Sequence, residues 1–229
     1  SRTRAPDRIF QETETVLELI AAGGWVMVPI ILCSILALAI IGERIWALQT
    51  RRVRPARLVG QVWHQVKSGT LDAQQLRKLR QGSSLGRVLA AGLTNMRNSR
   101  QIMMDAIEDA GRHEAQNLER FLNTLGTIAS ITPLLGLLGT VIGMIRVFTT
   151  ITQQGVGNAS ALAGGISEAL LTTAAGLMVA IPSLMAYRYF RGLVDNHLIA
   201  MEQEAMKLVE VIQGQRERGS IETPGGGGA

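Results

Sequence analysis

The residues of this sequence that could do chemistry are an acid and two hydroxyls set within long apolar runs. Glu168 is the one charged residue between 159 and 187, and an ionisable group in such a run costs about 3 kcal/mol at the centre of a membrane. Thr140 and Thr173 each place a hydroxyl, which can donate and accept a hydrogen bond, in an apolar run. Such groups inside a membrane typically mark a path for ions or protons. A carboxylate held by an arginine, and threonines bonded back to their own helices, are the structural alternatives.

Helix geometry places Arg146 at the same depth as one of these residues. If the runs that hold Thr140 and Thr173 form antiparallel helices, the two threonines lie level with each other. Arg146 then lies level with Glu168, about a turn and a half away. This register predicts an ion pair between Arg146 and Glu168 at the outer mouth, within one subunit or between neighbours, because either charge alone is costly in an apolar surrounding. Snorkelling of Arg146 to lipid headgroups is the alternative.

Small residues follow one face of the same two runs. Gly136, Gly139 and Gly143 lie together on the first run, and Gly176 lies on the small-residue face of the second. Gly139 and Gly143 have the GxxxG spacing that lets two membrane helices approach closely. We therefore expect these four glycines to be helix-packing residues.

The elements that must position these residues are three segments that are apolar on all sides: 23–41, 121–148 and 159–187. Each is long enough to cross a hydrocarbon core of about 30 Å, which takes about 20 helical residues. Trp25 and Trp46 bracket the first segment, as interfacial aromatic belts do. The sequence predicts an all-α membrane protein with three transmembrane helices, in which the long helices 2 and 3 extend into a cytoplasmic helical bundle.

Helical patterns beyond the spans support this extension. One helical face descends from Ile102 to Asn117 toward Phe121, which predicts a helix that runs without a break into the second span. After the third span, apolar residues recur at helical spacing from Val194 to Ile212.

Charge sets the orientation. The loop 153–160 carries no charge, whereas five arginines directly follow the first span: Arg44, Arg51, Arg52, Arg54 and Arg57. Because Lys and Arg near span ends mark the cytoplasmic side, we expect the N-terminus to be periplasmic and the C-terminus cytoplasmic in a bacterial inner membrane. The expected segments are a periplasmic N-terminal segment (1–22), transmembrane helix 1 (23–46), a cytoplasmic helical region (47–120), transmembrane helix 2 (121–150), a periplasmic turn (151–158), transmembrane helix 3 (159–188), and a cytoplasmic helix extension with a disordered tail (189–229).

Composition argues against several other classes of protein. The chain has one cysteine, Cys33, and its three histidines lie outside the spans, so we expect no metal site and no cofactor. No nucleophile stands with a base inside the spans, so we expect no enzyme. The net charge is +5, but the arginines gather beside the spans rather than among aromatic residues, which argues against a nucleic-acid partner.

Two stretches resemble a known family. The run LLGLLGTV at 134–141, followed by Gly143-Met144, resembles span two of the ExbB/TolQ/MotA proton-channel family. The run GISEALLTTAAGL at 165–177, followed by Ala180-Ile181-Pro182, resembles span three. The resemblance covers 125–187, in the order and topology that the family has.

The resemblance implies a function and a set of partners. Such subunits form a homo-oligomeric ring in the lipid, commonly a pentamer, around a pair of single-span ExbD-like partner helices whose membrane aspartate binds the proton. The two channel-facing threonines of the family map to Thr140 and Thr173, and its span-three glutamate maps to Glu168, so these three residues form the implied ion pathway. Arg146 stands where some members carry an uncharged polar residue.

The branch of the family is a further question. Three spans fit both ExbB and TolQ, whereas MotA-type flagellar stators have four. The long outer segment and the Gly23-Gly24 start of the first span most resemble ExbB, which serves outer-membrane uptake through a TonB-like energy transducer. A TolQ-like subunit of the Tol envelope-constriction system is one alternative, and a non-conducting membrane scaffold is another. Glu168 and the threonines favour a channel, because a scaffold gains nothing from an ionisable group in lipid. Proton and sodium flow both stay open.

Overall fold

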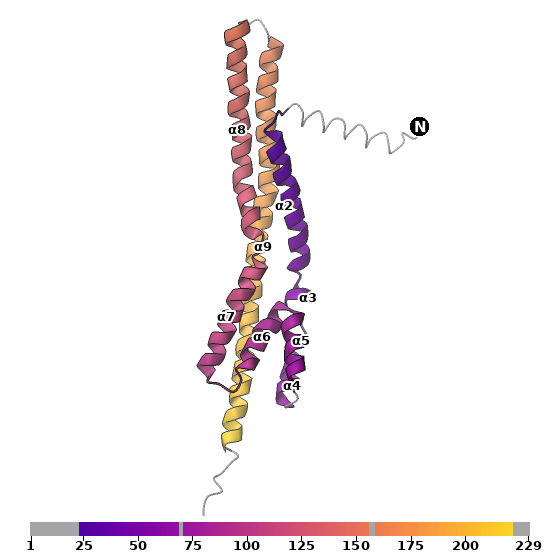
Figure 1. The fold of residues 1–229 in the computed structure, drawn as a ribbon, viewed down its shortest axis with the longest axis vertical. Coiled ribbons are helices and arrows are strands. Elements are labelled where there is room, and N and C mark those ends of the chain that lie inside the picture. The colour runs from indigo at the N-terminus through magenta and orange to yellow at the C-terminus, as the bar shows by residue number, and fades with distance from the viewer. Residues whose placement is uncertain (1–22, 69–70, 156–158, 222–229) are drawn as a thin grey trace, which may run out of the picture. The chain divides into compact units, whose positions relative to one another are not determined.

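The computed structural model describes residues 23–68, 71–155 and 159–221 (Figure 1). The expected periplasmic segment 1–22, residues 156–158 of the expected turn and residues 222–229 of the expected tail lie outside these described residues. Within the described part of the chain every regular element is a helix: α2 (Met27–Ala47), α3 (Thr50–Val53), α4 (Leu58–Lys67), α5 (Ala73–Gly82), α6 (Ser84–Thr94), α7 (Arg100–Leu118), α8 (Leu122–Gln154) and α9 (Ala159–Ile221).

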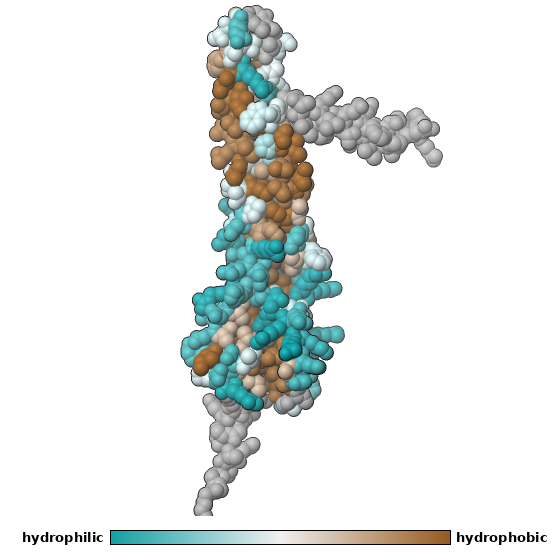
Figure 2. Space-filling model, in the orientation of Figure 1, coloured by the Kyte–Doolittle hydropathy of each residue, from teal (hydrophilic) through white to brown (hydrophobic). Residues whose placement is uncertain are grey.

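Among the described residues, three helices are long and apolar enough to cross a membrane: α2, α8 over Leu122–Gln153, and α9 over Leu162–Gly214. Their outer side chains are apolar and exposed, as Leu134, Leu137, Leu170 and Met185 are. Figure 2 shows the apolar surface of these spans in brown. An apolar surface of this extent suits lipid or another membrane helix. The predicted fold class, all-α with three membrane helices and long second and third helices, is confirmed.

The chain divides into two compact units, which are described separately. Unit 1 comprises the described residues of 1–42 and 121–188, and unit 2 those of 43–120 and 189–229.

In unit 1, glycines bring α8 and α9 together. A Cβ atom placed on Gly136 would lie 3.0 Å from the Cα of Thr173, and one on Gly143 would lie 2.8 Å from the Cβ of Ala169. Both distances are shorter than the 3.5–4.0 Å of an ordinary contact between carbon atoms. The two helices can therefore approach this closely only because these positions lack a side chain.

Each of these helices also contains a proline, Pro133 in α8 and Pro182 in α9. A proline inside a helix removes one backbone hydrogen bond and clashes with the preceding turn, which favours a bend. A Cβ on Gly176 would lie 2.8 Å from the carbonyl oxygen of Thr132, next to Pro133.

The N-terminal part of α2 packs on one side of the α8–α9 pair. Met27 and Ile30 of α2, with Val26 just before it, form a buried cluster with partly buried residues of all three helices. The latter are Ile31, Leu135, Ile142, Ala175 and Val179.

In unit 2, an ion pair whose acidic member is buried joins two helices. The helix α6 packs against α5 and α7. Glu114 of α7 is buried, and its two oxygens accept hydrogen bonds of 2.6 Å from Nε and Nη2 of Arg87 in α6. Burial alone would raise the pKa of Glu114, but hydrogen bonds from Arg87, Ser84 and Asn117, with the charge of Arg87, lower this pKa below its ordinary value. The pair therefore ties α6 to α7.

The expected unbroken helix from Ile102 into the second span is wrong. The helix α7 ends at Leu118, and Phe121 has φ 63°, a left-handed conformation that interrupts the hydrogen bonding of a helix. In unit 2, Arg44 is buried and its Nη1 donates a 2.9 Å hydrogen bond to the carbonyl of Leu118. This bond satisfies a carbonyl that the end of a helix leaves without a backbone partner.

Candidate functional site

The two threonines predicted to line the ion pathway both use their hydroxyls in hydrogen bonds. The Thr173 hydroxyl donates to the carbonyl of Gly136 at 3.0 Å, so this bond crosses from α9 to α8. The Thr140 hydroxyl donates to the carbonyl of Leu137 in its own helix at 2.6 Å. Each hydroxyl keeps acceptor lone pairs for a water molecule or a second donor. Both side chains are partly exposed in the single chain.

The structure places Arg146 and Glu168 in direct contact. Nη1 of Arg146 lies 2.5 Å and 2.6 Å from the two carboxylate oxygens of Glu168. The glutamate side chain is 16% exposed, whereas the arginine side chain is 51% exposed. The carboxylate is thus largely enclosed, and the guanidinium partly faces outward.

The threonines and the ion pair lie on different sides of the α8–α9 pair. Arg146 follows Thr140 by six residues, which is a rotation of about 240° around α8. Thr173 follows Glu168 by five residues, a rotation of about 140° around α9. The ion pair points toward the side that α2 covers, since Gly24 lies against both of its members.

The predicted site residues therefore form two groups. Arg146 and Glu168 form an ion pair, and Thr173 of α9 donates a hydrogen bond to the carbonyl of Gly136 in α8. Among the described residues, the Glu168 side chain makes no hydrogen bond to Thr140 or Thr173. We call the side of unit 1 that carries the two threonines the hydroxyl face.

Residues 80–203 match the sequence profile of the MotA/TolQ/ExbB proton channel family. This chain belongs to that family. An ExbB-like biopolymer transport protein of Synechocystis sp. is 36% identical over 198 residues, which cover 85% of this chain and 78% of the relative. An ExbB homologue of Methanothermobacter thermautotrophicus is 34% identical over 191 residues, covering 82% of this chain and 67% of the relative.

Two shorter matches come from different branches of the MotA/TolQ/ExbB family. Biopolymer transport protein ExbB of Neisseria gonorrhoeae is 44% identical over 96 residues, 40% of this chain and 42% of the relative. Tol-Pal system protein TolQ of Haemophilus influenzae is 40% identical over 84 residues, 37% of each chain. The family and the three apolar helices identify the chain as a multi-pass inner-membrane protein.

Sequence reasoning missed which hydroxyls of this family member lie inside the helix contact. Thr132 and Thr172 are 0% exposed and Ser183 is 1% exposed. All three donate to carbonyls of their own helices, at 2.5 Å for Thr132, 2.9 Å for Thr172 and 2.7 Å for Ser183. Thr172 packs on Gly139. Adjacent threonines at 172 and 173 give no signal in sequence for which of the two is buried.

Sequence reasoning also missed the place of Gly24. This residue has φ 68°, and a Cβ on it would overlap the Glu168 carboxylate and lie 3.7 Å from Nη1 of Arg146. The two consecutive glycines before Trp25 were a usable signal, because a glycine at the start of a span indicates an unusual backbone conformation or a close approach.

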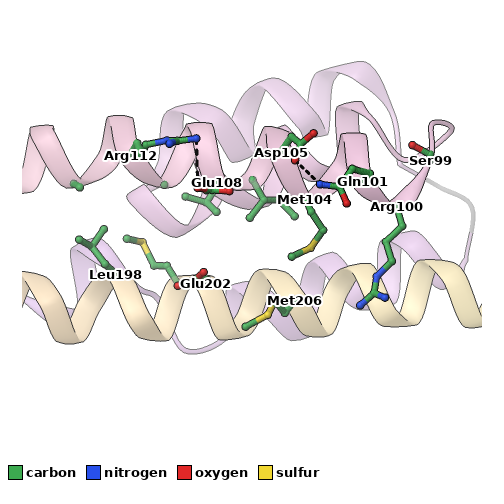
Figure 3. A pocket seen from close by; sticks show the side chains of 15 residues that line it. Ser99, Arg100, Gln101, Met104, Asp105, Glu108, Arg112, Leu198, Glu202 and Met206 are labelled. Carbon is green, nitrogen blue, oxygen red and sulfur yellow. Dashed lines mark hydrogen bonds and ion pairs between the residues drawn. The ribbon is translucent and has the colours of Figure 1, made fainter.

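A groove of about 730 Å³ lies in unit 2 between α7 and α9 (Figure 3). Met104 of α7 and Met206 of α9 contribute apolar side chains to its lining. Arg112 pairs with Glu108 at 3.4 Å along α7, not across the groove. The lining also includes charged side chains from both helices, among them Asp105 of α7 and Glu202 of α9. No cluster of three or more His, Cys, Asp or Glu that could hold a metal occurs among the residues that the structure describes.

Proposed function

We propose that this chain is a ring-forming subunit of a proton-driven motor of the inner membrane. Five copies surround the helices of a single-span, ExbD-like partner, and proton flow past the ring is converted into work on a TonB-like energy transducer. The observation that carries the proposal is the hydroxyl face, where Thr140 and the interhelical Thr173 bond offer polar atoms on an apolar helix pair.

The need for a partner follows from the carboxylates of the spans. Residues 122–154 and 159–187 contain no aspartate, and Glu168 is their one glutamate. Its carboxylate is held by Arg146 on the side that α2 covers. A proton relay along the hydroxyl face therefore needs a carboxylate from another chain.

The exposed apolar surface supports a ring in lipid. The outward residues of α8 and α9, such as Leu137, Val141, Leu170 and Met178, suit lipid or a neighbouring copy. The hydroxyl face suits the wet interior of an assembly better, because unpaired acceptor atoms are costly in hydrocarbon.

Proton flux into liposomes tests this function. We expect negligible flux with this protein alone and clear flux after addition of the single-span partner. Thr140→Val and Thr173→Val keep the shape of the side chain but remove donor and acceptor. Each should lower flux about tenfold or more, as expected when a hydrogen bond to a charged species is lost, while the ring remains intact.

Thr149→Val is the matched control. Thr149 lies on α8 about 180° from Thr140, is exposed, and donates to its own helix at Ile145 with a 2.8 Å bond. Two results would refute the shared channel and favour a scaffold. One is equal flux with and without the partner, and the other is equal flux in Thr140→Val, Thr173→Val and Thr149→Val.

The match to TolQ supports a second candidate, a subunit of an envelope-constriction system of the Tol type. The proteins that co-purify with the chain from its native membrane decide between the two: a TonB-like protein supports uptake, and a component of a Tol-Pal system supports the Tol alternative.

A further inference from the structure

The start of α2 is built on a glycine that no other residue type replaces without strain. Gly24 has φ 68°, in the left-handed region that side chains with a Cβ rarely adopt. Its carbonyl accepts a 3.1 Å hydrogen bond from the amide of Met27, the first residue of the helix. The conformation of Gly24 therefore directs the chain into α2.

The backbone of Gly24 lies directly against the ion pair of α8 and α9. A Cβ on Gly24 would overlap Oε1 of Glu168 and lie 3.1 Å from its carboxyl carbon. The same Cβ would lie 3.7 Å from Nη1 of Arg146. Glycine thus serves two needs here, the positive φ and the absence of a side chain over the carboxylate.

Gly24 lies nearer to the glutamate than to the arginine, because a Cβ there would overlap Oε1 of Glu168 but lie 3.7 Å from Nη1 of Arg146. Glu168 is also the enclosed member of the pair, at 16% exposure against 51% for Arg146. The carboxylate is therefore the group that a side chain at position 24 would displace.

We infer that Gly24 is a positioning residue that seats the Glu168 carboxylate on Arg146, on the side of the helix pair that α2 covers. Span one then takes part in the channel by holding the glutamate of span three, an inference that rests on the proposed function for its meaning in proton transfer. Between residues 122 and 187 the sequence holds no aspartate and no second glutamate that could take over the role of this carboxylate.

Carbodiimide labelling of Glu168 tests the inference on the purified full chain in lipid. Dicyclohexylcarbodiimide adds to a carboxyl group that it can reach in the membrane, and mass spectrometry locates the resulting acylurea. Gly24→Ala should raise the labelling rate of Glu168 about tenfold or more, because the methyl group forces the carboxylate away from its charge-assisted hydrogen bonds. Gly42→Ala, within the helix that Gly24 precedes, is the matched control, since nothing lies within 4 Å of a Cβ there.

A double-mutant cycle separates the contact from simple backbone strain. Glu168→Ala removes the group that the new methyl would meet, so Gly24→Ala should lower the melting temperature less in the Glu168→Ala background, where only the strain of the positive φ remains. Strain alone would give additive losses in the two backgrounds. Gly24→Asn provides a second variant if Gly24→Ala fails to fold, because asparagine tolerates positive φ but still carries a side chain into the carboxylate.

Two results would overturn the inference: Glu168 labelling in both Gly24 variants that equals that of Gly42→Ala, or additive losses of melting temperature in the cycle. Neither measurement uses the partner or proton flux. The positioning role of Gly24 can therefore be refuted without refuting the proposed channel. Likewise, a negative result in the flux experiments would not change what the labelling and melting measurements say about Glu168.

Discussion

Adding one methyl group at Gly139 should separate α8 from α9. A Cβ on Gly139 would lie 2.5 Å from the Cβ of Thr172, about 1 Å or more closer than an ordinary contact between carbon atoms. Thr172 cannot turn aside, because it is 0% exposed and its hydroxyl is bonded to the carbonyl of Ala169. The backbones must therefore move apart, and overpacking of this kind typically costs about 1–3 kcal/mol.

Thermal unfolding of the purified protein in detergent measures this cost for Gly139→Ala. Gly164→Ala on α9 is the matched control, because a Cβ there meets nothing within 4 Å, and replacing a helical glycine by alanine there should stabilise by about 0.5–1 kcal/mol. Thr172→Ala in the Gly139→Ala background should restore part of the loss, since it removes the groups that the methyl meets. Equal unfolding temperatures for Gly139→Ala and Gly164→Ala would refute close packing at this level.

Three further predictions concern charge. The folded pKa of Glu114 lies below its ordinary value, so its pairing with Arg87 stabilises at pH above about 4.5 and is lost as pH falls through the folded pKa. Glu114→Gln should thus lower the melting temperature at pH 7 and approach the wild type as the pH falls through the folded pKa of Glu114; a difference that does not change with pH contradicts this. Glu168→Gln and Arg146→Gln should each destabilise the ring, and the double variant should be milder than the sum; additive losses in this cycle would support snorkelling of Arg146. A cysteine at Gln74, in a Cys33→Ala background, should escape an impermeant thiol reagent in intact cells, and its labelling would reverse the expected orientation.

The membrane helices and the level of the ion pair could be predicted from the sequence. Long apolar runs indicate spans because only a helix satisfies its own backbone in lipid. The spacing of Arg146 and Glu168 placed the two charges level, and the structure shows them in contact. The depth of a residue follows from the helical rise alone, so it needs no knowledge of neighbouring chains.

The direction in which each side chain points was less predictable. The expected pathway groups Glu168 with Thr140 and Thr173, but the structure places Glu168 on the side of the helix pair that α2 covers. The sequence does not show which side α2 covers, and no periodic pattern predicts the left-handed conformation of Gly24. A sequence shows that a glycine is present, but not which group it approaches.

The break before α8 could not be predicted for a related reason. Phe121 adopts φ 63° although phenylalanine is neither glycine nor asparagine, the residues that usually signal such a conformation. The apolar periodicity continues through the break, since Leu118 and Leu122 are both buried. Periodicity therefore reports which residues are covered, and it does not report where the backbone stops being helical.

The prolines of α8 and α9 give the helix pair a shared place to flex. Pro182 lies between Gly176, which meets Thr132 of α8, and Tyr187, which meets Gly126. Pro133 is next to Thr132, so both missing backbone hydrogen bonds fall in one zone of the helix pair. Bending stiffness is lowest where a rung of hydrogen bonds is absent. A sideways load on unit 1 would therefore bend both helices together in this zone. The close contacts between α8 and α9 at Gly136 and beyond it could then stay in register.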